Sequence, residues 1–295
     1  MNIKQALKYG IELLKENNID EPILKTRIIL SGILNKTKEY LMVYELEELD
    51  EKLIKIFREN ISKLCKHIPI QYITNKQEFM GIEFYVDENV LIPQPDTEIL
   101  VEEVIGIAKK YGKTKILDLC TGSGAIGISI AKNIDNCEIA LSDISIYALE
   151  VATKNTKKIV GASIARPQNN GIGQKNCKIK IIQSDLFENI EEKFDIIVSN
   201  PPYIKSDVIK TLDKEVQNEP ILALDGGEDG LDIYRKIIEQ AYECLNENGY
   251  LCLEIGYDQK EEVIKLIEET NKYTNIYSKK DLAGNDRIII CKKEN

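Results

Sequence analysis

The chain has 295 residues, and its content of 43% hydrophobic and 30% charged residues is that of a globular protein. This composition excludes a disordered chain, and the length is enough for one large domain or two smaller ones. The formal net charge of −10 argues against tight nucleic-acid binding, because neutralising phosphates requires a basic surface.

Two further features indicate a cytoplasmic protein with no membrane contact. No apolar run approaches the roughly 18–20 residues that a membrane helix needs, and residue 1 opens an amphipathic segment rather than a signal peptide. The seven cysteines include no Cys-x-x-Cys pair. We therefore expect reduced thiols, with neither disulfides nor a metal site.

Residues 1–75 are predicted to form a small helical bundle. Pro22 opens a second helical segment, and Asp50 is placed to cap a third. In the first segment apolar residues recur at helical spacing, at Ile3, Leu7, Ile11 and Leu14. Such a stripe more often packs into a core than binds a ligand.

Residues 76–95 have the aromatic and β-branched texture of a β-hairpin around Gly81, and we expect them to link two domains. Pro93 and Pro95 end the second strand. A helix is predicted to start at residues 96–98 and to run to about Tyr111.

From residue 96 to residue 295, short apolar runs alternate with helical stretches. This alternation predicts an α/β domain with a mostly parallel sheet and helices on both faces. The candidate strands are 115–119, 137–142, 179–183, 194–199, 250–255 and 287–291. Residues 161–176 contain three glycines and a proline, which predicts a loop.

A glycine-rich turn follows the first of these strands. Gly122, Gly124 and Gly127 match Gly-x-Gly-x-x-Gly, in which the absence of Cβ atoms lets a ligand approach the backbone. About 20 residues later the next strand ends at Asp143, which can accept hydrogen bonds from the hydroxyls of a ribose. The two features predict an adenosine ligand. An S-adenosylmethionine enzyme, an NAD-dependent oxidoreductase and a non-catalytic adenosine-binding module all fit them, and the plainer alternative is that Asp143 only caps the next helix.

Asp118 lies inside the first of these strands. A buried carboxylate is costly without partners, so we expect its side chain to hydrogen-bond within the cofactor loop.

The sequence Asn200-Pro201-Pro202-Tyr203 ends the fourth candidate strand and is the most specific motif in the chain. An amide nitrogen is a poor nucleophile because its lone pair is delocalised, so an enzyme must hold the NH2 group in line with the methyl donor. The Asn200 side-chain oxygen and the Pro201 carbonyl can each accept one NH2 hydrogen, the prolines stiffen that carbonyl, and Tyr203 offers a face to the planar group. The motif predicts methyl transfer from sulfur to a planar amide or amino nitrogen without a metal. The alternative is that Asn-Pro-Pro is only a stiff turn that follows the strand, with no part in the chemistry.

Several segments together resemble the release factor glutamine methyltransferase family, and the likeness spans almost the whole chain. The segments are 91–98, 118–124, 198–204, 219–220, 226–231 and 253–256. The resemblance implies a helical substrate-recognition domain at 1–75 and a seven-stranded, Rossmann-like methyltransferase domain at 96–295. It implies that S-adenosyl-L-methionine methylates the side-chain amide nitrogen of the glutamine in the Gly-Gly-Gln motif of class-1 peptide-chain release factors.

The resemblance also implies roles for individual residues. Asn200, Pro201, Pro202 and Tyr203 would bind the glutamine and act in catalysis. The implied cofactor contacts are Asp118, Cys120, Thr121, Gly122, Ser123, Gly124, Asp143, Asp185, Leu186 and Asn200.

The chain departs from the usual pattern of that family at several positions. Gln94 stands where arginine is usual, which removes an anionic contact, and Leu186 stands where an aromatic residue is common, which weakens the packing on the cofactor. Cys120 replaces a usual glycine, and the 161–176 loop is longer than normal. None of these changes removes a catalytic group.

Other functions stay open on the sequence alone. A sister group of the family methylates a ribosomal-protein glutamine. Adenine-N6 DNA methyltransferases also carry Asn-Pro-Pro-Tyr, because the exocyclic amino group of a flipped-out adenine is planar too, although the net charge argues against them. His67, the only histidine, lies just before Pro69 in the helical part, and we expect a surface or packing role rather than a general base. The expected partners are class-1 release factors, with no nucleic acid bound and a monomeric enzyme.

Overall fold

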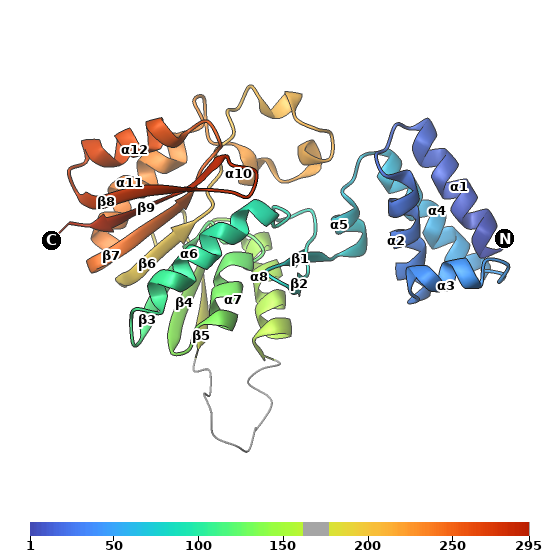
Figure 1. Ribbon diagram of the computed structural model, residues 1–295, viewed down its shortest axis with the longest axis horizontal. Helices are drawn as coiled ribbons and strands as arrows, with labels where there is room; N and C mark the ends of the chain where they lie inside the picture. Colours follow the sequence, from blue (N-terminus) through green and yellow to red (C-terminus); the bar gives the residue numbers. More distant parts are fainter. Residues whose placement is uncertain (162–176, 295) are drawn as a thin grey trace, which may run out of the picture. The chain divides into compact units, whose positions relative to one another are not determined.

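The computed structural model describes residues 1–161 and 177–294 (Figure 1). The chain divides into two compact units. The first, which we call the helical unit, consists of Met1–Lys76 together with Asp213–Asn218. The second, the sheet unit, consists of Gln77–Leu212 and Glu219–Asn295. The chain therefore passes from the sheet unit into the helical unit and back within a few residues.

The amino-terminal part of the helical unit is built from α1 (Ile3–Glu16), α2 (Pro22–Leu34), α3 (Lys38–Val43), α4 (Glu51–Cys65) and α5 (Ile70–Thr74). The predicted cap at Asp50 is confirmed, since its side chain accepts a hydrogen bond from the backbone N–H of Lys52 at 2.7 Å. The short helices α3 and α5 were not predicted.

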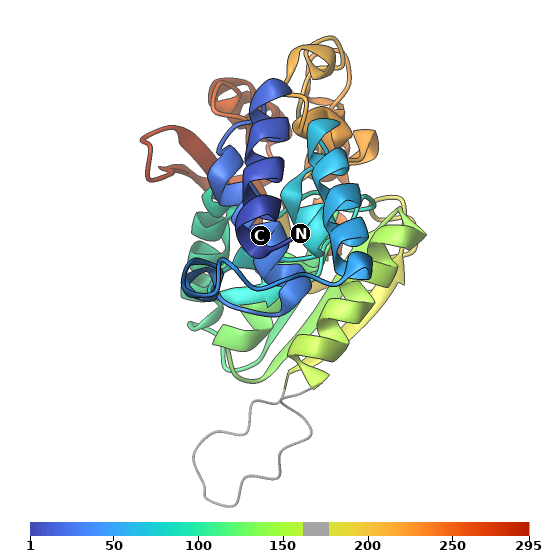
Figure 2. The ribbon, with the colours of Figure 1, turned by 90° about the vertical axis from the view of Figure 1, so that its right-hand side faces the viewer.

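The core of this unit forms where α1 packs against α2 and α4 (Figure 1, Figure 2). A Cβ atom on Gly10 would lie 2.7 Å from a methyl group of Thr26 and 3.0 Å from the ring of Phe57, so only glycine allows the helices to come this close. The buried face of α1 is Ile3, Ala6, Gly10 and Leu14. The predicted stripe is thus right at its ends, whereas Leu7 and Ile11 are only half-buried.

The segment Asp213–Asn218, which includes the short helix η3 (Val216–Asn218), is held on this unit by polar contacts. Glu215 forms an ion pair with Lys25, whose side chain is 10% exposed. The Asn218 side chain donates to the backbone carbonyl of His67 at 3.0 Å.

The sheet unit begins with the predicted hairpin, β1 (Gln77–Phe79) and β2 (Ile82–Phe84), which turns at Gly81 with φ of 68°. A seven-stranded sheet follows in the order β5-β4-β3-β6-β7-β9-β8. The strands are β3 (Thr114–Leu119), β4 (Cys137–Asp143), β5 (Lys178–Gln183), β6 (Phe194–Ser199), β7 (Leu245–Glu254), β8 (Tyr273–Lys280) and β9 (Asp286–Lys293). Strands β3 to β7 pair in parallel, and β9 runs antiparallel to both β7 and β8. The predicted α/β fold is confirmed.

Helices cover both faces of this sheet (Figure 1). The first core lies under α6 (Glu98–Ala108), α7 (Ala125–Asn133) and α8 (Ile146–Ile159). The second lies under α11 (Asp232–Cys244) and α12 (Lys260–Glu269). Short turns of helix, η1 (Pro95–Thr97), η2 (Ile209–Thr211) and α10 (Ile221–Leu224), occur in the connections.

The expectation of reduced cysteines throughout is wrong at one pair. Cys137, at the start of β4, and Cys177, just before β5, form a disulfide with their Cα atoms 4.5 Å apart. The next residues of the two strands, Glu138 and Lys178, are partners in the parallel register, which brings the cysteines opposite each other. The remaining five cysteines are free.

Part of the predicted organisation falls on residues that the structure leaves undescribed. The loop expected at 161–176 lies outside the described residues except for Gly161. Across the described ranges, no helix is both long and apolar enough to span a membrane. The same ranges hold no cluster of three or more His, Cys, Asp or Glu side chains suited to a metal ion.

Candidate active site

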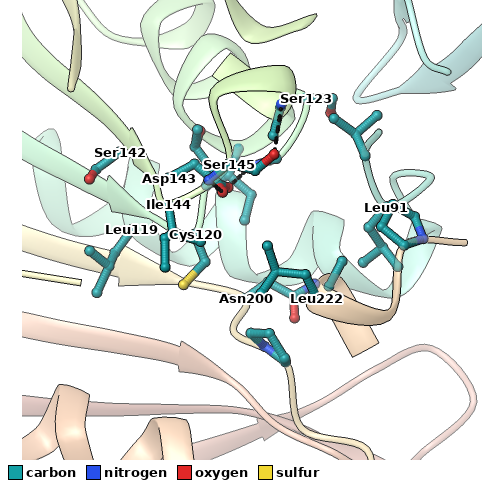
Figure 3. A pocket seen from close by; sticks show the side chains of 18 of the residues that line it. Leu91, Leu119, Cys120, Ser123, Ser142, Asp143, Ile144, Ser145, Asn200 and Leu222 are labelled. Carbon is teal, nitrogen blue, oxygen red and sulfur yellow. Dashed lines mark hydrogen bonds between the residues drawn. The ribbon is translucent and has the colours of Figure 1, made fainter. Parts of the chain in front are cut away.

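A cavity of about 330 Å³ opens at the carboxyl ends of β3, β4 and β6 (Figure 3). Ligands of open α/β sheets bind at this edge, and the volume is within the range of small-molecule sites. The cavity is lined by Cys120, Thr121, Gly122, Ser123, Asp143, Asp185, Leu186, Asn200 and Pro202 among the residues predicted from the sequence. In Figure 3, Asp143 and Ser145 lie on one side and Asn200 and Leu222 on the opposite side.

The glycine-rich turn gives the cavity its open wall. Gly122 and Gly124 have φ of 54° and 81°, a left-handed conformation that favours glycine, and Cys120 adopts it as well with φ of 59°. No atom lies within 4 Å of the place where a Cβ of Gly122 would stand, so the backbone there is free to meet a ligand. At Gly127, by contrast, a Cβ would lie 2.3 Å from Leu141, so this glycine lets α7 pack on the sheet.

Asp143 joins the glycine turn to the end of β4. Its Oδ2 accepts from the backbone N–H of Gly122 and its Oδ1 from that of Ser145, each at 2.9 Å. Burial raises the pKa of Asp143, and these hydrogen bonds oppose the rise. The side-chain cap of α8 is Ser145, so Asp143 does more than cap that helix. The two oxygens together offer about four acceptor sites, so the carboxylate, which lines the cavity, can still accept from a ligand there.

Asp118 lies beneath the turn and is not among the described residues that line the cavity. It is fully buried, and its Oδ2 accepts from the Thr121 hydroxyl at 2.6 Å and from the Gly127 N–H at 2.8 Å. Burial raises the pKa of Asp118 to about 7, against these two hydrogen bonds that lower it. The expected hydrogen-bonding role within the loop is therefore present, and its direct contact with a cofactor has no support from the cavity lining.

Of the three departures that line the cavity, Cys120 and Leu186 give it an apolar surface, whereas Gln94 is polar. Burial raises the pKa of the Cys120 thiol to about 12, so the thiol is neutral at physiological pH. Leu186 is 8% exposed and has φ of 47°, an uncommon backbone conformation for a leucine.

The Asn-Pro-Pro-Tyr turn begins where β6 ends. The Ser199 hydroxyl donates to the carbonyl of Leu119 at 2.7 Å and so ties this turn to the end of β3. The Asn200 side-chain nitrogen donates to the hydroxyl oxygen of Thr97, 3.4 Å away. The oxygen of the Asn200 side-chain amide is thereby available to a ligand in the cavity. Pro201 and Tyr203 are not among the residues that line the described cavity, and neither is Gly124.

The backbone of Tyr203 is clamped by glycines that approach it closely. A Cβ on Gly226 would lie 2.7 Å from the Cα atom of Tyr203, and one on Gly230 would lie 2.5 Å from its carbonyl oxygen. The Gln259 side chain donates to the same carbonyl at 2.9 Å. These contacts explain physically why glycines at 226 and 230 accompany the Asn-Pro-Pro-Tyr turn.

Several residues of the site were not predicted individually. Leu91, Gln94, Thr97 and Leu222 line the cavity from segments before α6 and around α10. Glu219 is 7% exposed and accepts from the backbone N–H of Ile92 at 2.8 Å, which fixes the first of these segments. Gln94 donates to the carbonyl of Ile92 at 3.0 Å. The signal that could have found these residues was the segment resemblance at 91–98 and 219–220.

Comparison with known proteins identifies the family. Residues 5–74 match the family described as PrmC N-terminal domain, and residues 95–212 match the Methyltransferase small domain. The release factor glutamine methyltransferase of Clostridium acetobutylicum is 41% identical over 295 residues, which cover 99% of this chain and 98% of that protein. The chain belongs to the release factor glutamine methyltransferase family. The member from Clostridium botulinum is 38% identical, over 99% of this chain and 100% of that protein.

A solved structure is also similar. It is the protein-(glutamine-N5) methyltransferase (release factor-specific) from Alicyclobacillus acidocaldarius, 26% identical, covering 72% of this chain and 100% of that chain with a TM-score of 0.42. Membership of the release factor glutamine methyltransferase family makes the chain a methyltransferase. A methyltransferase of this kind takes its methyl group from a donor of the S-adenosylmethionine type.

Proposed function

We propose that the chain methylates the side-chain amide nitrogen of the glutamine in the Gly-Gly-Gln motif of class-1 peptide-chain release factors. S-adenosylmethionine would occupy the cavity at the carboxyl ends of β3, β4 and β6. The relatives named for this activity support the proposal, because they align with this chain from end to end.

The residues of the cavity wall support this placement of the donor. The open backbone at Gly122 leaves room for a ligand against the turn, and the Asp143 carboxylate can accept from ribose hydroxyls. Ser123, Asp185 and Leu186 would complete the wall. When bound, S-adenosylmethionine supplies an electrophilic methyl group on a positively charged sulfur.

The acceptor side rests on one observation, which carries the proposal: Asn200 lines the same cavity as Asp143. In this proposal the Asn200 carbonyl oxygen and the Pro201 carbonyl each accept one hydrogen of the glutamine NH2 group. These two bonds orient the nitrogen lone pair toward the methyl group, which is the main catalytic task because the amide is intrinsically unreactive. Tyr203 packs against the planar amide, and its clamped backbone keeps the turn rigid.

We assign recognition of the intact release factor to the helical unit. Its α3 and the following turn expose apolar side chains that are usual at protein interfaces, with Met42, Val43 and Leu46 exposed at 64%, 72% and 71%. The Asn-Pro-Pro-Tyr turn alone would accept any suitably presented planar amide. Selection of the protein substrate therefore needs a separate surface.

The proposal is tested by incubating the full chain with labelled S-adenosylmethionine and three acceptors in parallel. The acceptors are a class-1 release factor, the large ribosomal subunit and plasmid DNA. We expect label on the release factor only. Label on a ribosomal protein or on adenine in the DNA would overturn the proposed substrate, while leaving a planar nitrogen as the acceptor.

A further inference from the structure

Asn155 in α8 is a fully buried polar side chain that has no part in the function described so far. Its side-chain oxygen accepts from the backbone N–H of Tyr85 at 2.7 Å. Its side-chain nitrogen donates to the backbone carbonyls of Tyr85 and Ser123, each at 2.9 Å. Tyr85 directly follows β2 of the hairpin, and Ser123 lies in the glycine-rich turn. One side chain therefore joins the hairpin to the turn on which we place the methyl donor.

These partners require a side-chain amide at position 155. An amide has two donor hydrogens and an acceptor oxygen, and all three have partners here. The reverse orientation of the amide would set its NH2 group against the N–H of Tyr85 and its oxygen against two carbonyls. An aspartate could accept from Tyr85, but an ionised carboxylate has no hydrogen to donate to either carbonyl. The buried carbonyl of Ser123 would then lose this donor, which costs free energy.

The same helix packs closely against the turn. Ala152 lies three residues before Asn155 on α8, and a Cβ on Gly124 would stand 3.4 Å from the Cβ of Ala152. Asp143, at the end of β4, holds the turn by accepting from another of its backbone N–H groups. The turn is thus fixed from β4 by Asp143 and from α8 by Asn155. Ser123, which Asn155 holds, itself lines the cavity.

We propose that Asn155 is a positioning residue for the methyl donor, which holds the glycine-rich turn in its binding conformation against the segment that follows the hairpin. This inference rests on the proposed placement of S-adenosylmethionine at that turn. A turn without this anchor adopts other conformations, and the affinity for the donor then falls with the fraction of molecules that remain competent to bind. Beyond Tyr85 the chain continues to Asn89, Val90 and Leu91, which line the cavity. The hairpin is then part of the cofactor site as well as a link in the chain.

The test measures the affinity of two full-length variants for S-adenosylmethionine by calorimetry. Asn155→Ala removes all three hydrogen bonds, whereas Asn155→Asp keeps nearly the same shape and loses the two donors when it is ionised. We expect each variant to raise the Kd about tenfold, the effect of a buried carbonyl left without its donor. The KM for S-adenosylmethionine should rise with the Kd, while kcat at saturating donor should change far less, because the bound donor restores the turn.

Lys158→Ala is the matched control. Lys158 lies three residues after Asn155 on α8 and contacts the hairpin through Glu83, donating to its carbonyl at 3.2 Å and to its carboxylate at 2.9 Å. This pair is half exposed, and exposed ion pairs contribute little. Because the contact is made to the hairpin and not to the turn, Lys158→Ala should keep the wild-type Kd.

Hydrogen exchange of the wild-type chain tests the same link without a substitution. The N–H of Gly124 bonds to the Thr121 carbonyl within the turn, and that of Tyr85 bonds to Asn155. We expect saturating S-adenosylmethionine to slow exchange at both groups, because Asn155 connects them. Protection of Gly124 without protection of Tyr85 would overturn the inference.

The outcomes distinguish this inference from the proposed function. A wild-type Kd for both folded Asn155 variants, together with a raised Kd for Asp143→Ala, would overturn the inference alone. A wild-type Kd for Asp143→Ala as well would show that the donor does not bind at the turn, and would refute the proposed cofactor site and the inference with it.

Discussion

Asp143 both accepts hydrogen bonds from the glycine turn and lines the proposed ribose site, so its replacement should affect stability as well as cofactor affinity. Asp143→Ala deprives the N–H groups of Gly122 and Ser145 of their acceptor. Hydrogen bonds to a charged group contribute about 1.5–3 kcal/mol each, but the buried carboxylate also loses its desolvation cost. We expect a net decrease of about 2 kcal/mol in the free energy of unfolding.

The effect on cofactor affinity should be of similar size and can be measured separately from stability. Losing a charged acceptor for the ribose hydroxyls should raise the Kd for S-adenosylmethionine by about 10- to 150-fold, which corresponds to the same 1.5–3 kcal/mol. Asp143→Asn should fall between wild type and Asp143→Ala, because the amide retains one acceptor oxygen. Isothermal titration calorimetry gives the Kd, and urea unfolding gives the stability.

Asp229 supplies the control for this experiment. Its Oδ1 accepts from the N–H of Leu231 at 3.0 Å just before α11, the same type of turn that Asp143 makes before α8. Asp229→Ala should leave the Kd unchanged. A wild-type Kd in folded Asp143→Ala would refute the placement of the ribose at Asp143.

The remaining predictions concern transfer, domain roles and pH. Asn200→Ala should lower kcat by about 10²–10³-fold with little change in cofactor Kd, as expected for a group that acts in the transition state. Asn200→Asp should keep partial activity, because a carboxylate still accepts the hydrogen bond. Wild-type rates for both variants would show that the Asn-Pro-Pro-Tyr motif is only a turn. A fragment beginning at Gln77 should bind S-adenosylmethionine in calorimetry but methylate the intact release factor poorly, and full activity would contradict the role given to the helical unit. Burial raises the pKa of Asp118 from 3.8 to about 7, so between these two pH values the folded chain holds a proton that the unfolded chain releases. The free energy of unfolding that this proton contributes is fully present below pH 3.8 and is lost as the pH rises through about 7. Asp118→Asn should flatten that decline in urea unfolding measured across this range, and an unchanged pH slope would show that the carboxyl titrates normally.

Strands β3, β4, β6 and β7 were predictable because each contains a short apolar run that is buried in the sheet. Predicted bounds at β4 and β6 agree with the structure to within one residue. Strand β8 (Tyr273–Lys280) was missed because it is an edge strand in which only Tyr273 is buried, so its sequence is largely polar. Strand β7 starts at Leu245, five residues before the predicted start at 250, because its first turn-like residues Asn246–Gly249 carry no apolar signal.

The predicted site residues that line the cavity come from compact motifs, in which the chemistry lies within a few consecutive residues. Thr97 could not be placed in the same way. It meets Asn200 across 103 positions of sequence, and only the completed fold brings the two side chains together. The disulfide escaped prediction for the same reason, since Cys137 and Cys177 are 40 positions apart and lie opposite each other only through strand register.

The central claim is that the methyl group goes to the amide nitrogen of one glutamine. Its most direct test is tandem mass spectrometry of a release factor after reaction with the full chain and S-adenosylmethionine. The account predicts a single added methyl on the side chain of the Gly-Gly-Gln glutamine, and no addition when that glutamine is replaced by glutamate. A methyl group on another residue, or one that survives the replacement, would contradict it.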